Sequence, residues 1–141
     1  MKLTENDITL NCRAMNREEV LKLADCELAR KRAVDAGFLD ALIAREKELS
    51  TWVGAGVALP HINRRDSHLV KTSSFHVLQF PEGVKWDKGH VAFLVVAVAA
   101  KDNEHIDILS GIASLLEDER LVDRLSMAKS SREFIALLPP E

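Results

Sequence analysis

Apolar positions in the first part of the chain recur at helical spacing. Between Asn16 and Gly37 they return every three or four residues, with charged residues on the opposite side. Asn16 and Glu19 form a capping-box pattern, and a glycine such as Gly37 is typical of the end of a helix. We therefore expect a first helix over residues 16–37. A second helix is expected over 38–49, where FLDALIAREKEL repeats the pattern.

Short apolar runs predict the strands. The expected strands cover residues 7–10, 51–53, 57–59, 71–80, 84–86 and 91–99. Pro81-Glu82-Gly83 is expected to form a turn between two of them. The run from Val91 to Ala100 is too short to cross a bilayer as a helix. Its many valines predict a central strand that is buried on both faces.

The last third of the chain is predicted to be mostly helical. Asp102 and Asn103 can cap a helix over 104–116, and a short helix is expected over 119–127. Ser130 and Glu133 form a second capping box at the start of the last helix. Helices and strands alternate loosely, without a linker or a repeat. We therefore expect residues 1–141 to form one α/β sandwich, a mixed sheet with helices on both faces.

Composition narrows the class of protein. The chain has 141 residues, of which 47% are hydrophobic and 29% charged, which excludes a disordered tail or a coiled coil. The net charge of −3 disfavours a nucleic-acid-binding module. Cys12 and Cys26 are too few for a disulfide scaffold and lie in segments expected to be buried, so neither is favoured as a nucleophile. The N-terminus resembles no signal peptide, and we expect a cytoplasmic protein without direct membrane insertion.

The candidate chemistry lies mainly in the five histidines. None forms an H-E-x-x-H or H-x-H pair, so no metal site is predicted, although a fold can bring distant ligands together. His61 follows a short apolar strand and Pro60, at a strand end where α/β proteins often place functional groups. A neutral imidazole, with an ordinary pKa of about 6.5, is a competent nucleophile. The alternative is a loop histidine that only bonds to the backbone.

Two further side chains are weaker candidates when each is taken alone. His105 lies at the expected start of helix 104–116, where backbone N–H groups attract anions. By itself it is more typical of a half-buried structural histidine. Arg45 lies near the end of helix 38–49 and by itself is typical of a solvated helix face.

The spacing around His61 resembles that of a known family. Glu46 is followed after six residues by Val53-Gly54, and after two more by Val57-Ala58-Leu59-Pro60-His61. The chain is similar to the enzyme IIA domains of the mannitol/fructose class of the bacterial phosphoenolpyruvate-dependent sugar phosphotransferase system. The segments AREKEL, FPEGVKW and AKDNEHIDIL resemble the mannitol type most. One departure is Ile62, where the family usually has a small residue.

The resemblance implies a phosphotransferase with a phosphohistidine intermediate. His61 would accept a phosphoryl group from the histidine phosphocarrier protein, by family analogy on Nε2. It would then pass the group to a cysteine of enzyme IIB for uptake of a mannitol- or fructose-like sugar. Arg45 and His105 would bind the phosphoryl oxygens, at one shallow site shared with His61. No cofactor, metal or nucleic acid is implied.

Two other functions remain open at the level of sequence. The chain is also similar to the nitrogen-related branch of the same superfamily, whose phosphocarriers regulate by binding other proteins. A third possibility is a binding domain that no longer carries a phosphoryl group. Ile62 is the only residue that favours this third function, and the presence of Arg45, His61 and His105 argues against it.

Overall fold

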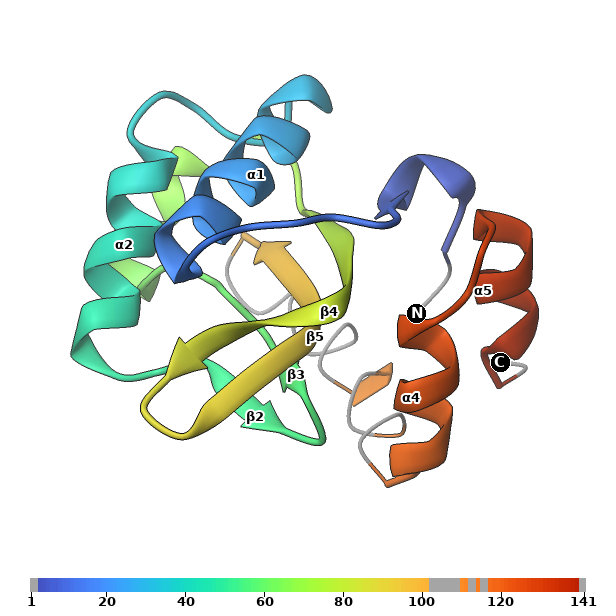
Figure 1. Ribbon diagram of the computed structural model, residues 1–141. Helices are drawn as coiled ribbons and strands as arrows, with labels where there is room; N and C mark the ends of the chain where they lie inside the picture. Colours follow the sequence, from blue (N-terminus) through green and yellow to red (C-terminus); the bar gives the residue numbers. More distant parts are fainter. Residues whose placement is uncertain (1–2, 102–109, 112–113, 115–116, 140–141) are drawn as a thin grey trace.

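A five-stranded mixed sheet runs through the middle of the molecule (Figure 1). The computed structural model describes residues 3–101, 110, 111, 114 and 117–139. The strands are β1 (Ile8–Thr9), β2 (Trp52–Gly54), β3 (Val57–Ala58), β4 (Ser74–Asp87) and β5 (His90–Ala99). Their order is β1-β4-β5-β3-β2, with β1–β4 and β3–β5 parallel and the other two pairs antiparallel.

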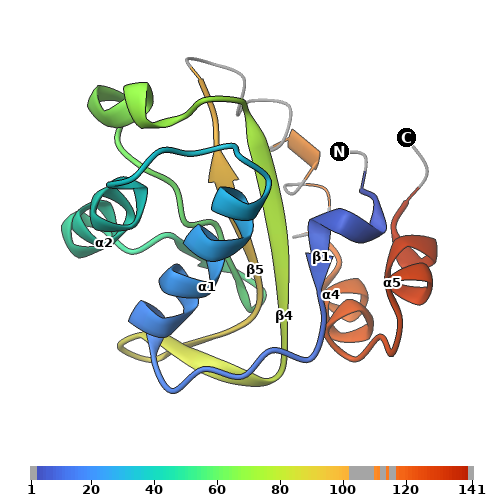
Figure 2. The same ribbon diagram turned by 90° about the horizontal axis from the view of Figure 1, so that it is seen from above.

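Helices cover both faces of this sheet (Figure 2). One face carries α1 (Arg17–Arg30) and α2 (Phe38–Glu48), and the other carries α4 (Glu119–Ser126) and α5 (Ser131–Leu137). Two short 3-10 helices, η1 (Glu5–Asp7) and η2 (Arg64–Leu69), lie in the connections. The expected α/β architecture is therefore confirmed. The helix expected over 104–116 lies for the most part outside the described residues.

Strand β5 contributes to two hydrophobic cores. Leu94, Val96 and Val98 pack in the core on the α4–α5 side. The alternating residues Val95, Ala97 and Ala99 pack in the core on the α1–α2 side. Successive side chains of a strand point to opposite faces, so a continuous apolar run is what a strand between two helical layers requires. The prediction of a central strand buried on both faces is confirmed.

Two of the predicted caps, Asn16 and Ser130, are confirmed, whereas Asp102 and Asn103 lie outside the described residues. Asn16 Oδ1 accepts from the Glu19 backbone N–H at 3.0 Å, and Ser130 Oγ accepts from the Glu133 N–H at 3.0 Å. The expected end of the first helix at Gly37 is wrong, because α1 ends at Arg30. Gly37 instead precedes α2 with φ of +98°, a left-handed conformation that glycine adopts without strain.

The expected turn over residues 81–83 is also wrong. Strand β4 continues through these residues, and its register against β5 shifts between Gln79 and Val84. Gly83 has φ of +76°, and a Cβ placed there would lie only 2.6 Å from Val91 Cγ1. The glycine therefore marks an irregularity inside a long strand, where the backbone of β4 closely approaches β5.

The two cysteines differ from the expectation of buried thiols. Cys12 is half-buried, whereas Cys26 is exposed on α1. Ala24 and Leu28 lie on the buried face of α1. Cys26 is two residues from each of them, so it points to the opposite, solvent-exposed side of the helix. Burial raises the pKa of the Cys12 thiol, which disfavours its reactive thiolate form. Among the described residues, no helix has the length and apolar character needed to cross a membrane.

Candidate functional site

His61 follows the end of β3 on a segment that is held from both sides. The backbone N–H of Leu59 donates to the Thr51 carbonyl at 2.9 Å, on the β2 side. The backbone N–H of Val98 donates to the Pro60 carbonyl at 2.9 Å, on the β5 side. Leu59 and Pro60 are buried, whereas the His61 side chain is half-buried. The backbone that leads to the histidine is therefore fixed, and the ring itself remains partly accessible.

The imidazole of His61 is held by a backbone group. Its Nδ1 lies 2.7 Å from the carbonyl oxygen of Leu59. Since a carbonyl oxygen only accepts hydrogen bonds, Nδ1 carries the proton, and in the neutral ring the lone pair is then on Nε2. This is the backbone bond of an ordinary loop histidine. It is equally the bond that a nucleophilic imidazole needs to fix its tautomer.

The C-terminal turn of α2 lies against the loop that follows His61. Glu48 Oε1 accepts from Asn63 Nδ2 at 3.3 Å and from Arg65 Nη2 at 3.0 Å. Arg45 lies one helical turn before Glu48 and is half-buried, with Nη1 donating to the Leu49 carbonyl at 2.5 Å. The turn that carries Arg45 is thus next to the loop that begins at His61. A shared phosphoryl site of Arg45 and His61 stays a prediction, and His105 lies outside the described residues.

Ile62 packs partly into the hydrophobic core. Its side chain is half-buried and packs against the hydrophobic cluster under α1 and α2. The branched residue that departs from the family pattern therefore contributes to core packing and also remains partly exposed at the surface.

The other described histidines have different surroundings. His76 is fully buried in β4, and His68 is exposed on η2. His90 bonds to Asp87 and stacks on the Trp52 ring, with centroids 3.9 Å apart. Among the described residues no group of three or more possible ligands could hold a metal ion.

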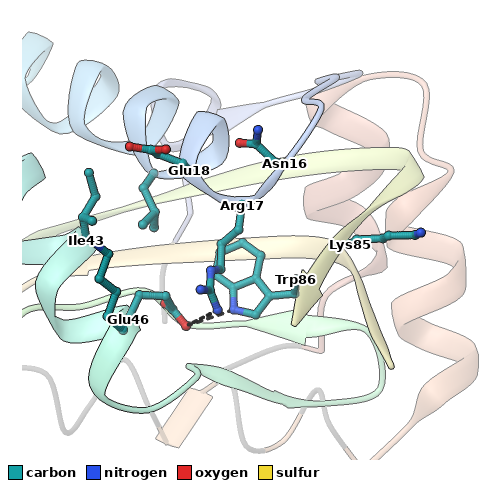
Figure 3. Close-up of a pocket in the computed structure, with 9 residues that line it drawn as sticks. Asn16, Arg17, Glu18, Ile43, Glu46, Lys85 and Trp86 are labelled. Carbon is teal, nitrogen blue, oxygen red and sulfur yellow. Dashed lines mark hydrogen bonds and ion pairs between the residues drawn. The ribbon is translucent and has the colours of Figure 1, made fainter. Parts of the chain in front are cut away.

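Glu46 is a residue of this region whose role was not predicted from the sequence. Its carboxylate points away from the solvent toward Trp86 and Arg17 (Figure 3), at the edge of a cavity of about 400 Å³. It stands at the first position of the spacing that led to His61. The fixed spacing indicates that this position matters, but it does not show which groups the carboxylate contacts.

Comparison with known proteins defines the family. Residues 1–139 match the family model described as "Phosphoenolpyruvate-dependent sugar phosphotransferase system, EIIA 2". The chain belongs to this family of enzyme IIA domains. It is 40% identical over 134 residues to the mannitol-specific phosphotransferase enzyme IIA component of Staphylococcus aureus, covering 94% of this chain and 92% of that protein.

The family domain also occurs within longer proteins. The chain is 33% identical over 141 residues to a multiphosphoryl transfer protein of Haemophilus influenzae, covering 100% of this chain. It spans only 28% of that relative's length.

Solved structures share the fold over nearly the whole chain. The crystal structure of IIA mannitol from Escherichia coli matches with a TM-score of 0.90 at 30% identity, covering 99% of this chain and 100% of that one. A complex of enzyme IIA mannitol with phosphorylated enzyme IIB mannitol from the same organism also gives 0.90, at 30% identity, with 97% and 96% covered. The nitrogen regulatory protein IIA-Ntr of Neisseria meningitidis is less similar, with 0.81 at 26% identity and 96% and 95% covered.

Proposed function

We propose that His61 accepts a phosphoryl group from a histidine phosphocarrier protein and passes it to a cysteine of an enzyme IIB. The observation that carries this proposal is the hydrogen bond from His61 Nδ1 to the Leu59 carbonyl. It places the proton on Nδ1, so that Nε2 has the lone pair needed to attack phosphorus. The transfer serves the uptake of a mannitol- or fructose-like sugar.

The chemistry asks for little beyond positioning and charge stabilisation. In the first step the Nε2 lone pair forms a new N–P bond while the N–P bond of the donor histidine breaks. The electron pair of the broken bond returns to the donor imidazole. The proton stays on Nδ1, and the Leu59 carbonyl oxygen that accepts its hydrogen bond stabilises the positive charge that the phosphorylated ring acquires. In the second step a cysteine thiolate attacks phosphorus, and the electron pair returns to Nε2.

We assign to Arg45 and His105 the role of donating hydrogen bonds to the oxygens of the transferred phosphoryl group. Charge spreads over three equatorial oxygens in the transition state, and a planar guanidinium can donate to two of them at once. The closeness of the α2 end to the loop after His61 supports Arg45 in this role. For His105 the support is its place in the family pattern and at the expected start of a helix.

The same surface would serve two partners in turn. Donor and acceptor must each bring a reactive side chain to His61, so they bind overlapping areas and exclude each other. The Escherichia coli complex of IIA mannitol with phosphorylated enzyme IIB supports an enzyme IIB as the acceptor. We place the reaction in the cytoplasm, which agrees with the two free cysteines.

The test is to incubate the protein with phosphoenolpyruvate, enzyme I and the phosphocarrier and to follow its intact mass. We expect the addition of one phosphoryl group that is lost in acid and kept in alkali, as for phosphorus bonded to imidazole nitrogen. Adding a mannitol-type enzyme IIB should then remove it. A stable phosphorylated form that no enzyme IIB accepts would favour the nitrogen-related regulatory function. Absence of any phosphorylation would contradict the proposal and favour a pure binding domain.

A further inference from the structure

Glu46 is the one buried carboxylate among the described residues. Only 4% of its surface is exposed, although it follows directly after Arg45 on the last turn of α2. A buried carboxylate is costly unless several donors satisfy it. Its position beside a candidate phosphoryl ligand therefore calls for an account of what holds it.

Three donors satisfy the Glu46 carboxylate. Oε2 accepts from the backbone N–H of Thr51 at 2.7 Å, and Oε1 accepts from the Thr51 hydroxyl at 2.6 Å. Oε2 also accepts from Nε1 of Trp86, a residue of β4, at 3.2 Å (Figure 3). The Arg17 guanidinium is farther away, with Nη1 at 3.7 Å from Oε2. Neutral donors on β4 and on the segment before β2 thus hold the carboxylate, and Arg17 adds a longer ion pair.

The contacts of Thr51 continue to His61. The Thr51 carbonyl accepts from the backbone N–H of Leu59 at 2.9 Å. The Leu59 carbonyl in turn accepts from His61 Nδ1 at 2.7 Å. The buried Glu46 side chain is therefore connected through two residues, Thr51 and Leu59, to the carbonyl oxygen that sets the tautomer of His61. The same side chain also fixes the helical turn that bears Arg45.

We propose that Glu46 is a positioning residue for phosphoryl transfer. It holds Arg45 through the end of α2, and it holds the Leu59 carbonyl under His61 through Thr51. The proposal rests on the proposed function of His61 and adds to it a group that does not touch the phosphoryl. The role is geometric, because Glu46 acts on His61 by fixing the position of the backbone and not through its charge.

This role separates two substitutions of similar size. In Glu46→Gln one amide oxygen can still accept from the Thr51 N–H and Trp86 Nε1, while the amide NH₂ donates to the Thr51 hydroxyl, which rotates to accept. Glu46→Leu removes every acceptor and leaves two buried N–H groups unpaired. Glutamine therefore loses the charge and keeps the geometry, whereas leucine loses both.

The experiment compares the rates of phosphorylation and of transfer to enzyme IIB for these two variants. We expect Glu46→Gln to remain close to the natural protein and Glu46→Leu to be slower by roughly tenfold to a hundredfold, as for other groups that orient a reacting side chain. NMR of the ¹⁵N-labelled imidazoles gives an independent readout. His61 should be protonated on Nδ1 in the natural protein and in Glu46→Gln, and should show a mixture of tautomers in Glu46→Leu.

Gln79 offers a matched control on the other face of the sheet. It is 1% exposed, donates to the carbonyls of Leu125 and Ala128 at 2.9 and 3.0 Å, and accepts from the Asn11 N–H at 2.8 Å. Gln79→Leu should lose stability as Glu46→Leu does but keep the rates and the His61 tautomer. If Glu46→Leu does not fold, Thr51→Val serves instead, because it removes one donor and should give an intermediate rate.

Two results would overturn the proposal. One is a Glu46→Leu protein, or Thr51→Val in its place, with the natural rates and tautomer. The other is a Glu46→Gln protein as slow as Glu46→Leu, which would make the charge the important property. Failure of the proposed function is distinguishable, since it appears as a natural protein that is not phosphorylated on His61. The tautomer comparison still tests the positioning role in that case.

Discussion

His61 and His76 are two imidazoles of one sheet with opposite surroundings. His61 lies just beyond β3 and is half-buried, and its Nδ1 donates a hydrogen bond to a backbone carbonyl. His76 lies within β4 and is 0% exposed. Its Nε2 is 2.7 Å from Thr9 Oγ1 and 3.3 Å from Glu27 Oε2, and its Nδ1 has no hydrogen-bond partner in the part of the chain that the structure describes.

The difference shows what would separate the proposed nucleophile from a structural histidine. Burial above all, together with the positive charges of Lys31 and Arg30, lowers the pKa of His76 to about 4. The carboxylates of Glu27 and Asp7 oppose this shift without cancelling it. His76 is therefore neutral near pH 7, as a nucleophile must be, but no partner can reach it. In the proposed function, His61 differs from His76 in its accessibility and in the backbone acceptor that fixes its tautomer.

The largest effect that tests this comparison is expected from His61→Ala. It should abolish phosphorylation, because the proposed phosphoryl acceptor is removed. His76→Gln should be phosphorylated like the natural protein in the same intact-mass assay. Undiminished phosphate on His61→Ala, or its loss in a folded His76→Gln, would show that the two histidines have been assigned the wrong roles.

Arg45→Ala should slow both transfer steps, by roughly a hundredfold each, because a positioned donor to the transferring oxygens is lost. Quenched-flow rates of phosphorylation and of transfer to enzyme IIB measure this. Arg13→Ala is the matched control, since Arg13 is an exposed arginine whose ion pair is with Glu82 on the surface. Equal rates for the two variants would remove Arg45 from the site.

His105→Ala should affect one step more than the other. We expect it to be phosphorylated still, but to transfer the group to enzyme IIB about tenfold more slowly, since a neighbouring donor stabilises charge without forming the bond. The ratio of the two rates is the measurement. Complete loss of phosphorylation would mean that the second histidine has a larger role than a neighbouring donor.

The last test concerns His76 and its effect on stability, not on the rate of phosphoryl transfer. With an ordinary pKa of 6.5 when unfolded and about 4 when folded, the unfolded chain binds more protons between these values. The free energy of unfolding should therefore decrease as the pH falls from 6.5 to 4, by up to about 3 kcal/mol from this residue. Urea unfolding at several pH values should show a weaker dependence for His76→Gln. Identical slopes in the two proteins would contradict the lowered pKa.

Local patterns predicted those features that depend on neighbouring residues in the chain. The helix caps at Asn16 and Ser130 and the central strand after Val91 follow from residue type and spacing alone. The fixed spacing ending at Pro60-His61 located the candidate nucleophile at a strand end.

Features set by distant contacts were missed. In the sequence Gly83 is typical of a turn, because the approach of Val91, which excludes a Cβ, exists only after β4 and β5 pair. Gly37 is typical of a helix end, and the sequence does not show that it instead precedes the next helix. The buried Glu46 carboxylate accepts from Trp86, which is forty residues away along the chain.

The bond between His61 and the Leu59 carbonyl has a consequence for how this domain can diverge. A backbone oxygen is present whatever side chain occupies position 59, so no single substitution can delete the acceptor. Variation in the surrounding side chains is tolerated as long as the path of the backbone is preserved. Ile62 can therefore stand beside His61 without removing the acceptor of its Nδ1, and on the proposed function new partner surfaces can evolve around an unchanged imidazole.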